Sequence, residues 1–245
     1  MTITGGPTTP LVGILAGLGP LAGAYFYRRL VELTSAEDDQ EHLSVVLISD
    51  PTIPPRSEHL LHGGRSPAPE LIQGAQRLVR AGATLIAIPS STSHAYYSEI
   101  AGAVDVPVLN LLAEAVDAVR AVGWRRVAIV ATTATVAAQL YAPYLPPGIV
   151  GVTADPRTQE ELQKVVDDVK RGGDLEAGRD QLTALLSREC WESCDGVLLA
   201  CTELPLVQPR RADRPFVSAT DVLVRAVLRE SRKVVHPWGS EADAT

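Results

Sequence analysis

Aromatic side chains are scarce in this chain of 245 residues, which contains three Trp, six Tyr and two Phe. Because 46% of its residues are hydrophobic, we expect a core built mainly from Val, Leu, Ile and Ala. No apolar run approaches the roughly 20 residues that a membrane-spanning helix needs. No basic stripe is present either, and the net charge is −7. Neither a membrane nor a nucleic acid is therefore expected as a partner.

Cysteine is also rare, at three residues, and the N-terminus lacks the charged and apolar regions of a secretory signal. Three Cys without such a signal are typical of a protein in the reducing cytoplasm. Residues 1–10 are rich in Thr, Gly and Pro, and residues 233–245 show little pattern. We expect both ends to be flexible tails.

Apolar runs alternate along the chain with segments of helical period. The runs are continuously apolar, which is typical of parallel strands covered on both faces. This alternation predicts an α/β fold. Strands are expected at residues 11–16, 43–49, 84–89, 106–110, 126–131, 196–200 and 215–218, and helices at 22–35, 67–81, 94–102, 111–122, 135–142, 158–171, 175–190 and 220–232.

A weak internal repeat divides this pattern into two halves. Residues 12–16 resemble residues 127–131, and the run that ends at Ile88 resembles the run that ends at Ala200 at a similar offset. The repeat predicts two similar parallel-sheet α/β domains related by a pseudo-twofold axis. We expect the first domain to span residues 11–115 plus 219–232, and the second to span residues 116–218.

Ser90 and Cys201 each follow the end of one of the repeated strands. Ligands of parallel sheets bind beyond the carboxyl ends of the strands, so both residues are expected to face one cleft between the domains. Cys201 lies at a predicted strand-to-helix turn, where a helix N-terminus would lower the thiol pKa and favour a reactive thiolate. Cys190 and Cys194 have no His near them in the sequence. We expect them to be small core residues, and we expect no metal site.

The turn Gly17-Leu18-Gly19-Pro20 follows the first strand and opens a helix. It formally matches a dinucleotide-binding fingerprint, but Pro20 removes a backbone N–H that a bound phosphate would need. We therefore expect no nucleotide cofactor, and we expect the backbone at Gly17 and Leu18 to face an anion such as a carboxylate. A tight turn that only permits close packing is the alternative.

Three further polar residues, Arg56, Lys170 and His94, are weaker candidates for the site. Arg56 follows a stiff Pro-rich loop and suits bidentate carboxylate binding, although an Arg in a loop is equally a solvated surface charge. Lys170, taken alone, is a cation favoured by the C-terminus of its helix. A nucleophile–base pair of Ser90 with His94 is disfavoured because no G-x-S-x-G elbow surrounds the Ser. His94 is expected either to hold the residues that contact the substrate or to have a purely structural role.

Together, four motifs resemble the aspartate/glutamate racemase superfamily, and most closely its aspartate racemase branch. The resemblance runs from about Val12 to Arg229. In chain order the motifs are residues 13–20 (Gly-Ile-Leu-Ala-Gly-Leu-Gly-Pro), 51–57 (Pro-Thr-Ile-Pro-Pro-Arg-Ser), 86–94 (Ile-Ala-Ile-Pro, then Ser-Ser-Thr-Ser-His) and 200–206 (Ala-Cys-Thr-Glu-Leu-Pro-Leu).

The resemblance implies a cofactor-independent homodimeric enzyme whose active site lies between two α/β domains. Family members use two Cys on opposite faces of the substrate α-carbon. The resemblance places the second at Cys201 and puts Ser90 at the position of the first. It assigns Arg56 and Lys170 to the substrate carboxylates. Positions that hold the α-carboxylate and amino group are matched by Thr92, Thr135 and Thr202. Further candidates for substrate binding are Ser91, Gly17 and Leu18. Candidates for supporting residues are His94 and Glu203.

Ser90 departs from the family pattern, in which a Cys is usual. A Ser hydroxyl titrates far above neutral pH, so Ser90 cannot match a thiolate as a proton acceptor. We expect a racemase of an acidic amino acid, aspartate before glutamate, with proton transfer biased to one side. Three alternatives stay open: a one-Cys decarboxylase of a malonate-type acid, a catalytically weak ligand-binding or tailoring homologue, and a two-Cys racemase whose first Cys was changed to Ser by engineering.

Overall fold

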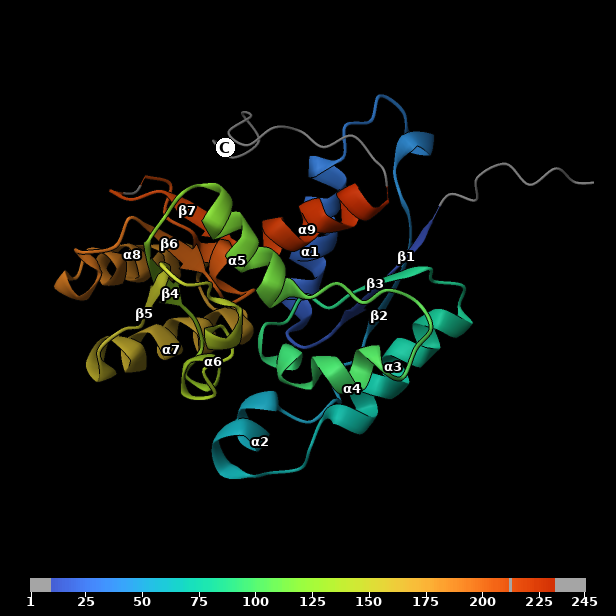
Figure 1. The fold of residues 1–245 in the computed structure, drawn as a ribbon, viewed down its shortest axis with the longest axis horizontal. Helices are drawn as coiled ribbons and strands as arrows, with labels where there is room; N and C mark the ends of the chain where they lie inside the picture. Colours follow the sequence, from blue (N-terminus) through green and yellow to red (C-terminus); the bar gives the residue numbers. More distant parts are fainter. Residues whose placement is uncertain (1–9, 212, 232–245) are drawn as a thin grey trace, which may run out of the picture.

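The computed structural model describes residues 10–211 and 213–231, which form an α/β fold with two parallel sheets (Figure 1). This confirms the fold class predicted from the sequence. The first sheet has the order β2-β1-β3, and the second has the order β5-β4-β6-β7. The strands are β1 (Leu11–Ala16), β2 (Ser44–Ser49), β3 (Leu85–Ala87), β4 (Arg126–Val130), β5 (Val150–Val152), β6 (Gly196–Leu199) and β7 (Phe216–Ser218).

α-Helices lie between successive strands, as is usual for parallel pairing, except between β6 and β7, where a 3-10 turn (Leu204–Val207) lies in the connection. Because none of those in the described ranges is both long and apolar enough, the described helices cannot cross a membrane. The helices are α1 (Pro20–Leu33), α2 (Arg56–His62), α3 (Ala68–Arg80), α4 (Tyr97–Ala101), α5 (Leu111–Ala121), α6 (Thr133–Ala137), α7 (Pro156–Lys170), α8 (Leu175–Leu186) and α9 (Ala219–Glu230).

Several local predictions differ from the structure. β5 was not predicted, because it has three residues and a central Gly151. The expected strand at 106–110 is reduced to one bridge between Val108 and Ile86. The helix expected at 135–142 ends early, because Gln139 adopts a left-handed backbone conformation, with φ 50°. Residues 1–9, part of one expected tail, and 233–245 lie outside the described residues.

The two halves repeat one chain path. In each half, the first strand lies between the second and the third, and the path continues through a polar cap into a helix. Asn110 caps α5 by accepting from Leu112 and Ala113, and Ser218 caps α9 by accepting from Asp221. This correspondence is the pseudo-twofold relation that the sequence repeat predicts.

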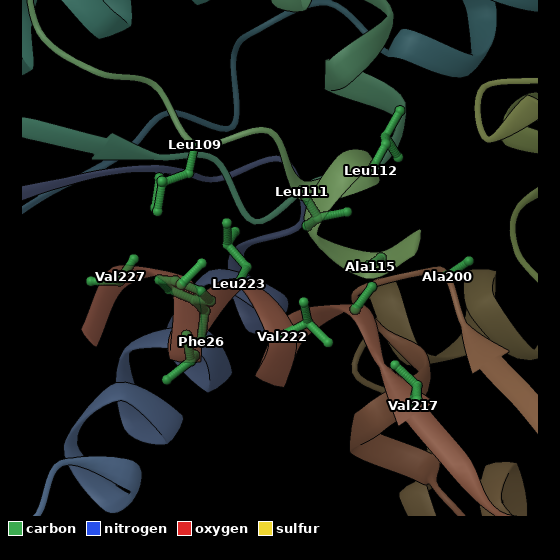
Figure 2. Packing of buried hydrophobic residues seen from close by; sticks show 14 of the residues in the cluster. Phe26, Leu109, Leu111, Leu112, Ala115, Ala200, Val217, Val222, Leu223 and Val227 are labelled. Carbon is green, nitrogen blue, oxygen red and sulfur yellow. The ribbon is translucent and has the colours of Figure 1, made fainter. Parts of the chain in front are cut away.

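α5 and α9, the last helices of the two repeats, pack against each other. Figure 2 shows Leu111 and Ala115 of α5 close to Val222 and Leu223 of α9, with Phe26 of α1 beneath them. One buried apolar cluster therefore runs from the first sheet into the second. Burial of this shared surface holds the two halves together at their base.

α9 also packs on α1, so the end of the chain returns to its beginning. Arg29 of α1 donates from Nε to Asp221 of α9 at 2.8 Å, and from one terminal nitrogen to Glu32 at 2.9 Å. The Arg29 side chain is almost fully buried, so the pair fixes the orientation of α9.

Candidate active site

Ser90 and Cys201 line one small cavity beyond the carboxyl ends of β3 and β6. Its volume is about 20 Å³. The cavity brings together most of the residues that the sequence singles out, but Gly17, Arg56 and His94 do not line it. The lining residues are Leu18, Ser90, Ser91, Thr92, Thr132, Thr135, Lys170, Cys201, Thr202 and Glu203.

The Cys201 thiol is held by a neighbouring carboxylate. Cys201 is 3% exposed, and its Sγ donates to Oε2 of Glu203 at 3.0 Å. Burial, and next the negative charge of Glu203, raise the pKa of Cys201 well above its usual value, while Lys170 opposes the shift. The helix N-terminus that was expected to lower the thiol pKa is absent, because only a short 3-10 turn (Leu204–Val207) follows Cys201, and the pKa shift is in the opposite direction.

Glu203 occupies an enclosed position between the halves. Its side chain is buried, and Oε1 lies over Gly19, where a Cβ atom would clash with it. Oε2 accepts from Cys201 and, at 3.5 Å, from the Thr202 hydroxyl, whereas Oε1 has no hydrogen-bond partner within the described ranges. The absence of a side chain at Gly19 thus lets a carboxylate from the second half reach the first turn of the first half.

The loop at Ser90 carries a hydroxyl network instead of a thiol–carboxylate pair. Ser93 donates from Oγ to Oγ of Ser90 at 2.8 Å, and both residues are buried. Ser91 donates from Oγ to the carbonyl of Ala200 at 2.7 Å, across to the other half. No charged group hydrogen-bonds the Ser90 hydroxyl within residues 10–211 and 213–231.

His94 holds this loop but does not hydrogen-bond the Ser90 hydroxyl. Its Nε2 accepts from the backbone N–H of Leu111 at 3.0 Å, so Nδ1 carries the proton and donates to the carbonyl of Ser90 at 2.8 Å. Burial lowers the pKa of His94. A neutral imidazole therefore ties the Ser90 loop to the start of α5, which agrees with the supporting role considered from the sequence.

Arg56 lies behind Leu18 rather than in the cavity. Its guanidinium donates to the carbonyls of Leu18 and Pro54, and its buried Nε has no partner in the described part of the chain. Burial lowers the pKa of Arg56, and the charge of Glu203 opposes this. The unpartnered Nε is a donor that a carboxylate entering beside Leu18 would satisfy.

The second half contributes a cation and a capped helix. Lys170, at the end of α7, lines the cavity and lowers the pKa of Cys201. Thr135, in the first turn of α6, bonds through its hydroxyl to that of Thr132 at 2.9 Å. Sequence reasoning missed Thr132. The internal repeat could have identified it, because residues 12–16 align with residues 127–131 and Thr132 therefore corresponds to Gly17.

Comparison with known proteins identifies the family of the chain. Residues 15–227 match the family model described as Asp/Glu/hydantoin racemase. The chain belongs to this family. The broad specificity amino-acid racemase RacX of Bacillus subtilis is 24% identical over 223 residues, covering 89% of this chain and 96% of RacX.

Two solved structures place the fold. Picrophilus torridus aspartate racemase superposes with a TM-score of 0.85 at 27% identity, covering 96% of this chain and 97% of that one. Arylmalonate decarboxylase gives a TM-score of 0.55 at 17% identity, covering 93% and 96%, and shows a shared fold alone.

Proposed function

We propose that the protein is a cofactor-independent racemase or epimerase of an acidic amino acid, with aspartate as the first candidate substrate. The meeting of Ser90 and Cys201 at one cavity, from pseudo-equivalent strand ends, carries the proposal. Membership of the racemase family and the likeness to an aspartate racemase support it. The cytoplasm is the proposed compartment.

Cys201 is proposed to act as a proton carrier with Glu203 as its proton store. The thiol proton moves to the Glu203 carboxylate, and the resulting thiolate removes the substrate α-proton. The electrons of the broken C–H bond delocalise into the substrate α-carboxylate, where Lys170 and Arg56 stabilise the added negative charge. A proton returned from Cys201 regenerates the starting enantiomer, whereas a proton from Ser90 or a water beside it gives the inverted one.

Thr92, Thr135 and Thr202 are proposed to orient the substrate through their hydroxyl groups, with the backbone at Gly17 and Leu18 behind them. A cavity of about 20 Å³ has room for about one water molecule and not for an amino acid. The lining must therefore move on binding. If the hydrogen bond from Arg56 to the Leu18 carbonyl breaks during this movement, the guanidinium becomes available to bind a substrate carboxylate.

A decarboxylase of a malonate-type acid is the second candidate. The raised pKa of Cys201 favours it, because protonation of an enediolate needs a proton donor and not a base. Hydroxyl groups around Ser90 suit an enediolate as hydrogen-bond donors.

Proton NMR in deuterated water tests the proposal. Aspartate and glutamate are expected to gain α-deuterium with the wild-type protein, and Cys201→Ala is expected to lower the rate by about 10²–10⁴-fold. Cys190→Ala is the matched control, because that thiol lies outside the cavity. Carbon dioxide release from a malonate, with no exchange of any amino acid, would establish the second candidate instead.

A homodimer is proposed as the working state. α1 exposes Tyr27 and Val31 beside a groove of about 360 Å³ that Leu43 and Val45 also line. We propose this groove, with the exposed apolar side chains beside it, as the association surface. Light scattering is expected to give twice the chain mass for the wild type and a monomer for Tyr27→Lys, and a monomeric wild type would contradict the proposal.

A further inference from the structure

One buried hydrogen bond joins the two strand ends directly. Ser91 follows Ser90 in the first half, and Ala200 precedes Cys201 in the second. The Ser91 hydroxyl donates to the Ala200 carbonyl at 2.7 Å. Ser91 is 4% exposed and Ala200 is fully buried, so water does not compete for this bond.

Each end of this bond is fixed within its own half. The Ala200 backbone N–H donates to the carbonyl of Val130 in β4 at 2.9 Å. The Ser91 carbonyl accepts from the backbone N–H of His94 at 3.1 Å, and the same His94 holds the Ser90 carbonyl. A shift of either strand end is therefore transmitted to the other through the Ser91–Ala200 bond.

Tyr141, also from the second half, closes the space next to Ser91. It is 3% exposed and belongs to the apolar cluster that contains Ala200. Burial raises the pKa of Tyr141, and the neighbouring Ser91 hydroxyl opposes this shift. The buried Tyr141 hydroxyl has no hydrogen-bond partner in the ranges described. Ser91 is thus enclosed by the opposite half.

We propose that Ser91 is a positioning residue whose bond to Ala200 sets the separation between residue 90 and Cys201. This inference rests on the proposed function, in which groups on the two sides address one α-carbon. It differs from direct donation to a substrate carboxylate, because the single hydroxyl proton of Ser91 is already donated to Ala200.

The kinetic test separates positioning from binding. Ser91→Ala is expected to lower kcat for α-proton exchange by about 10–100-fold, the scale of a small misplacement, with KM changed less than about threefold. Ser91→Thr restores the hydroxyl and is expected to recover most of kcat. A raised KM at unchanged kcat would make Ser91 a substrate ligand and overturn the proposal.

Thr34→Val is the matched control for loss of a buried hydroxyl. Thr34 donates from Oγ1 to the carbonyl of Leu30 at 2.6 Å at the end of α1 and does not line the cavity. Because Thr34 does line the groove beside α1, light scattering first checks that the variant keeps the oligomeric state of the wild type. Its loss is expected to lower thermal stability about as much as Ser91→Ala, with unchanged kcat. An equal fall of kcat in both variants would attribute the Ser91 effect to stability and overturn the proposal.

A second readout does not depend on activity. In a Ser90→Cys background, a short alkylating reagent with two thiol-reactive groups crosslinks residue 90 to Cys201, and peptide mapping gives the yield. Adding Ser91→Ala is expected to change the yield at least severalfold, and adding Ser91→Thr is expected to leave it near the Ser90→Cys value. If wild-type protein exchanges no amino acid, the proposed function fails, yet an unaltered yield with Ser91→Ala still separately overturns the positioning role.

Discussion

The two strand ends at the cavity share a backbone plan but differ in the protons that they can move. At the end of β6, Cys201 bonds to the Glu203 carboxylate, so a thiol and a proton acceptor lie side by side. At the end of β3, Ser90 bonds to Ser93, and both groups are hydroxyls that titrate far above neutral pH. Pseudo-symmetry of the fold therefore does not carry over to the chemistry.

The difference between the two strand ends cannot make inversion faster in one direction than in the other. Two enantiomers have equal free energies in solution, so kcat/KM for inversion must be equal in both directions whatever groups act. The bias expected from the sequence must appear elsewhere. Cys201 and Glu203 can exchange the α-proton of the enantiomer that faces them and return a solvent proton to the same face. Exchange with retention on one side is thus the expected sign of the asymmetry.

Ser90→Cys would remove the chemical difference between the two strand ends, and it has the largest expected effect. A thiol at residue 90 supplies the second proton acceptor, so inversion is expected to rise by about 10²–10⁴-fold in both directions. Polarimetry with each enantiomer measures the rate. No gain in a variant that stays folded would show that Ser90 does not limit inversion.

Glu203→Gln tests the strand end at Cys201 by removing the carboxylate that the thiol contacts. The Glu203 charge raises the pKa of Cys201, so its removal is expected to lower that pKa and to shift thiol alkylation to lower pH. The exchange rate is nevertheless expected to fall about tenfold or more, because the proton store is lost. An alkylation profile that stays in place or moves to higher pH would contradict the Cys201–Glu203 pair.

His94 gives the smallest effect, which is on stability. Its pKa is lowered in the folded protein, so the neutral form stabilises the fold above its unfolded value of about 6.5, and this contribution is lost as the pH falls below that value. His94→Asn is expected to cost about 1–3 kcal/mol at pH 8 and to weaken the acid dependence. Urea unfolding at pH 8 and pH 5 measures both, and equal pH dependence in both proteins would contradict this role.

Sequence reasoning reached the fold through continuous apolar strands and the internal repeat, and reached Cys201 and Ser90 through the ends of those strands. It missed the Cys201–Glu203 contact, because side-chain direction after a strand depends on whether a helix or a short turn follows. It also left open where Arg56 lies. The division of the chain into residues 11–115 plus 219–232 and 116–218 stays a prediction, although α9 does pack on α1.

The most direct measurement compares the two enantiomers of aspartate in deuterated water, following α-deuterium uptake and inversion in the same sample. One enantiomer is expected to take up deuterium with retention faster than it inverts, and the other is expected to take up deuterium only as it inverts. Cys201→Ala is expected to lower the rate of uptake by about 10²–10⁴-fold. Equal uptake with retention from both enantiomers would contradict the claim that fast proton exchange is confined to the substrate face next to Cys201.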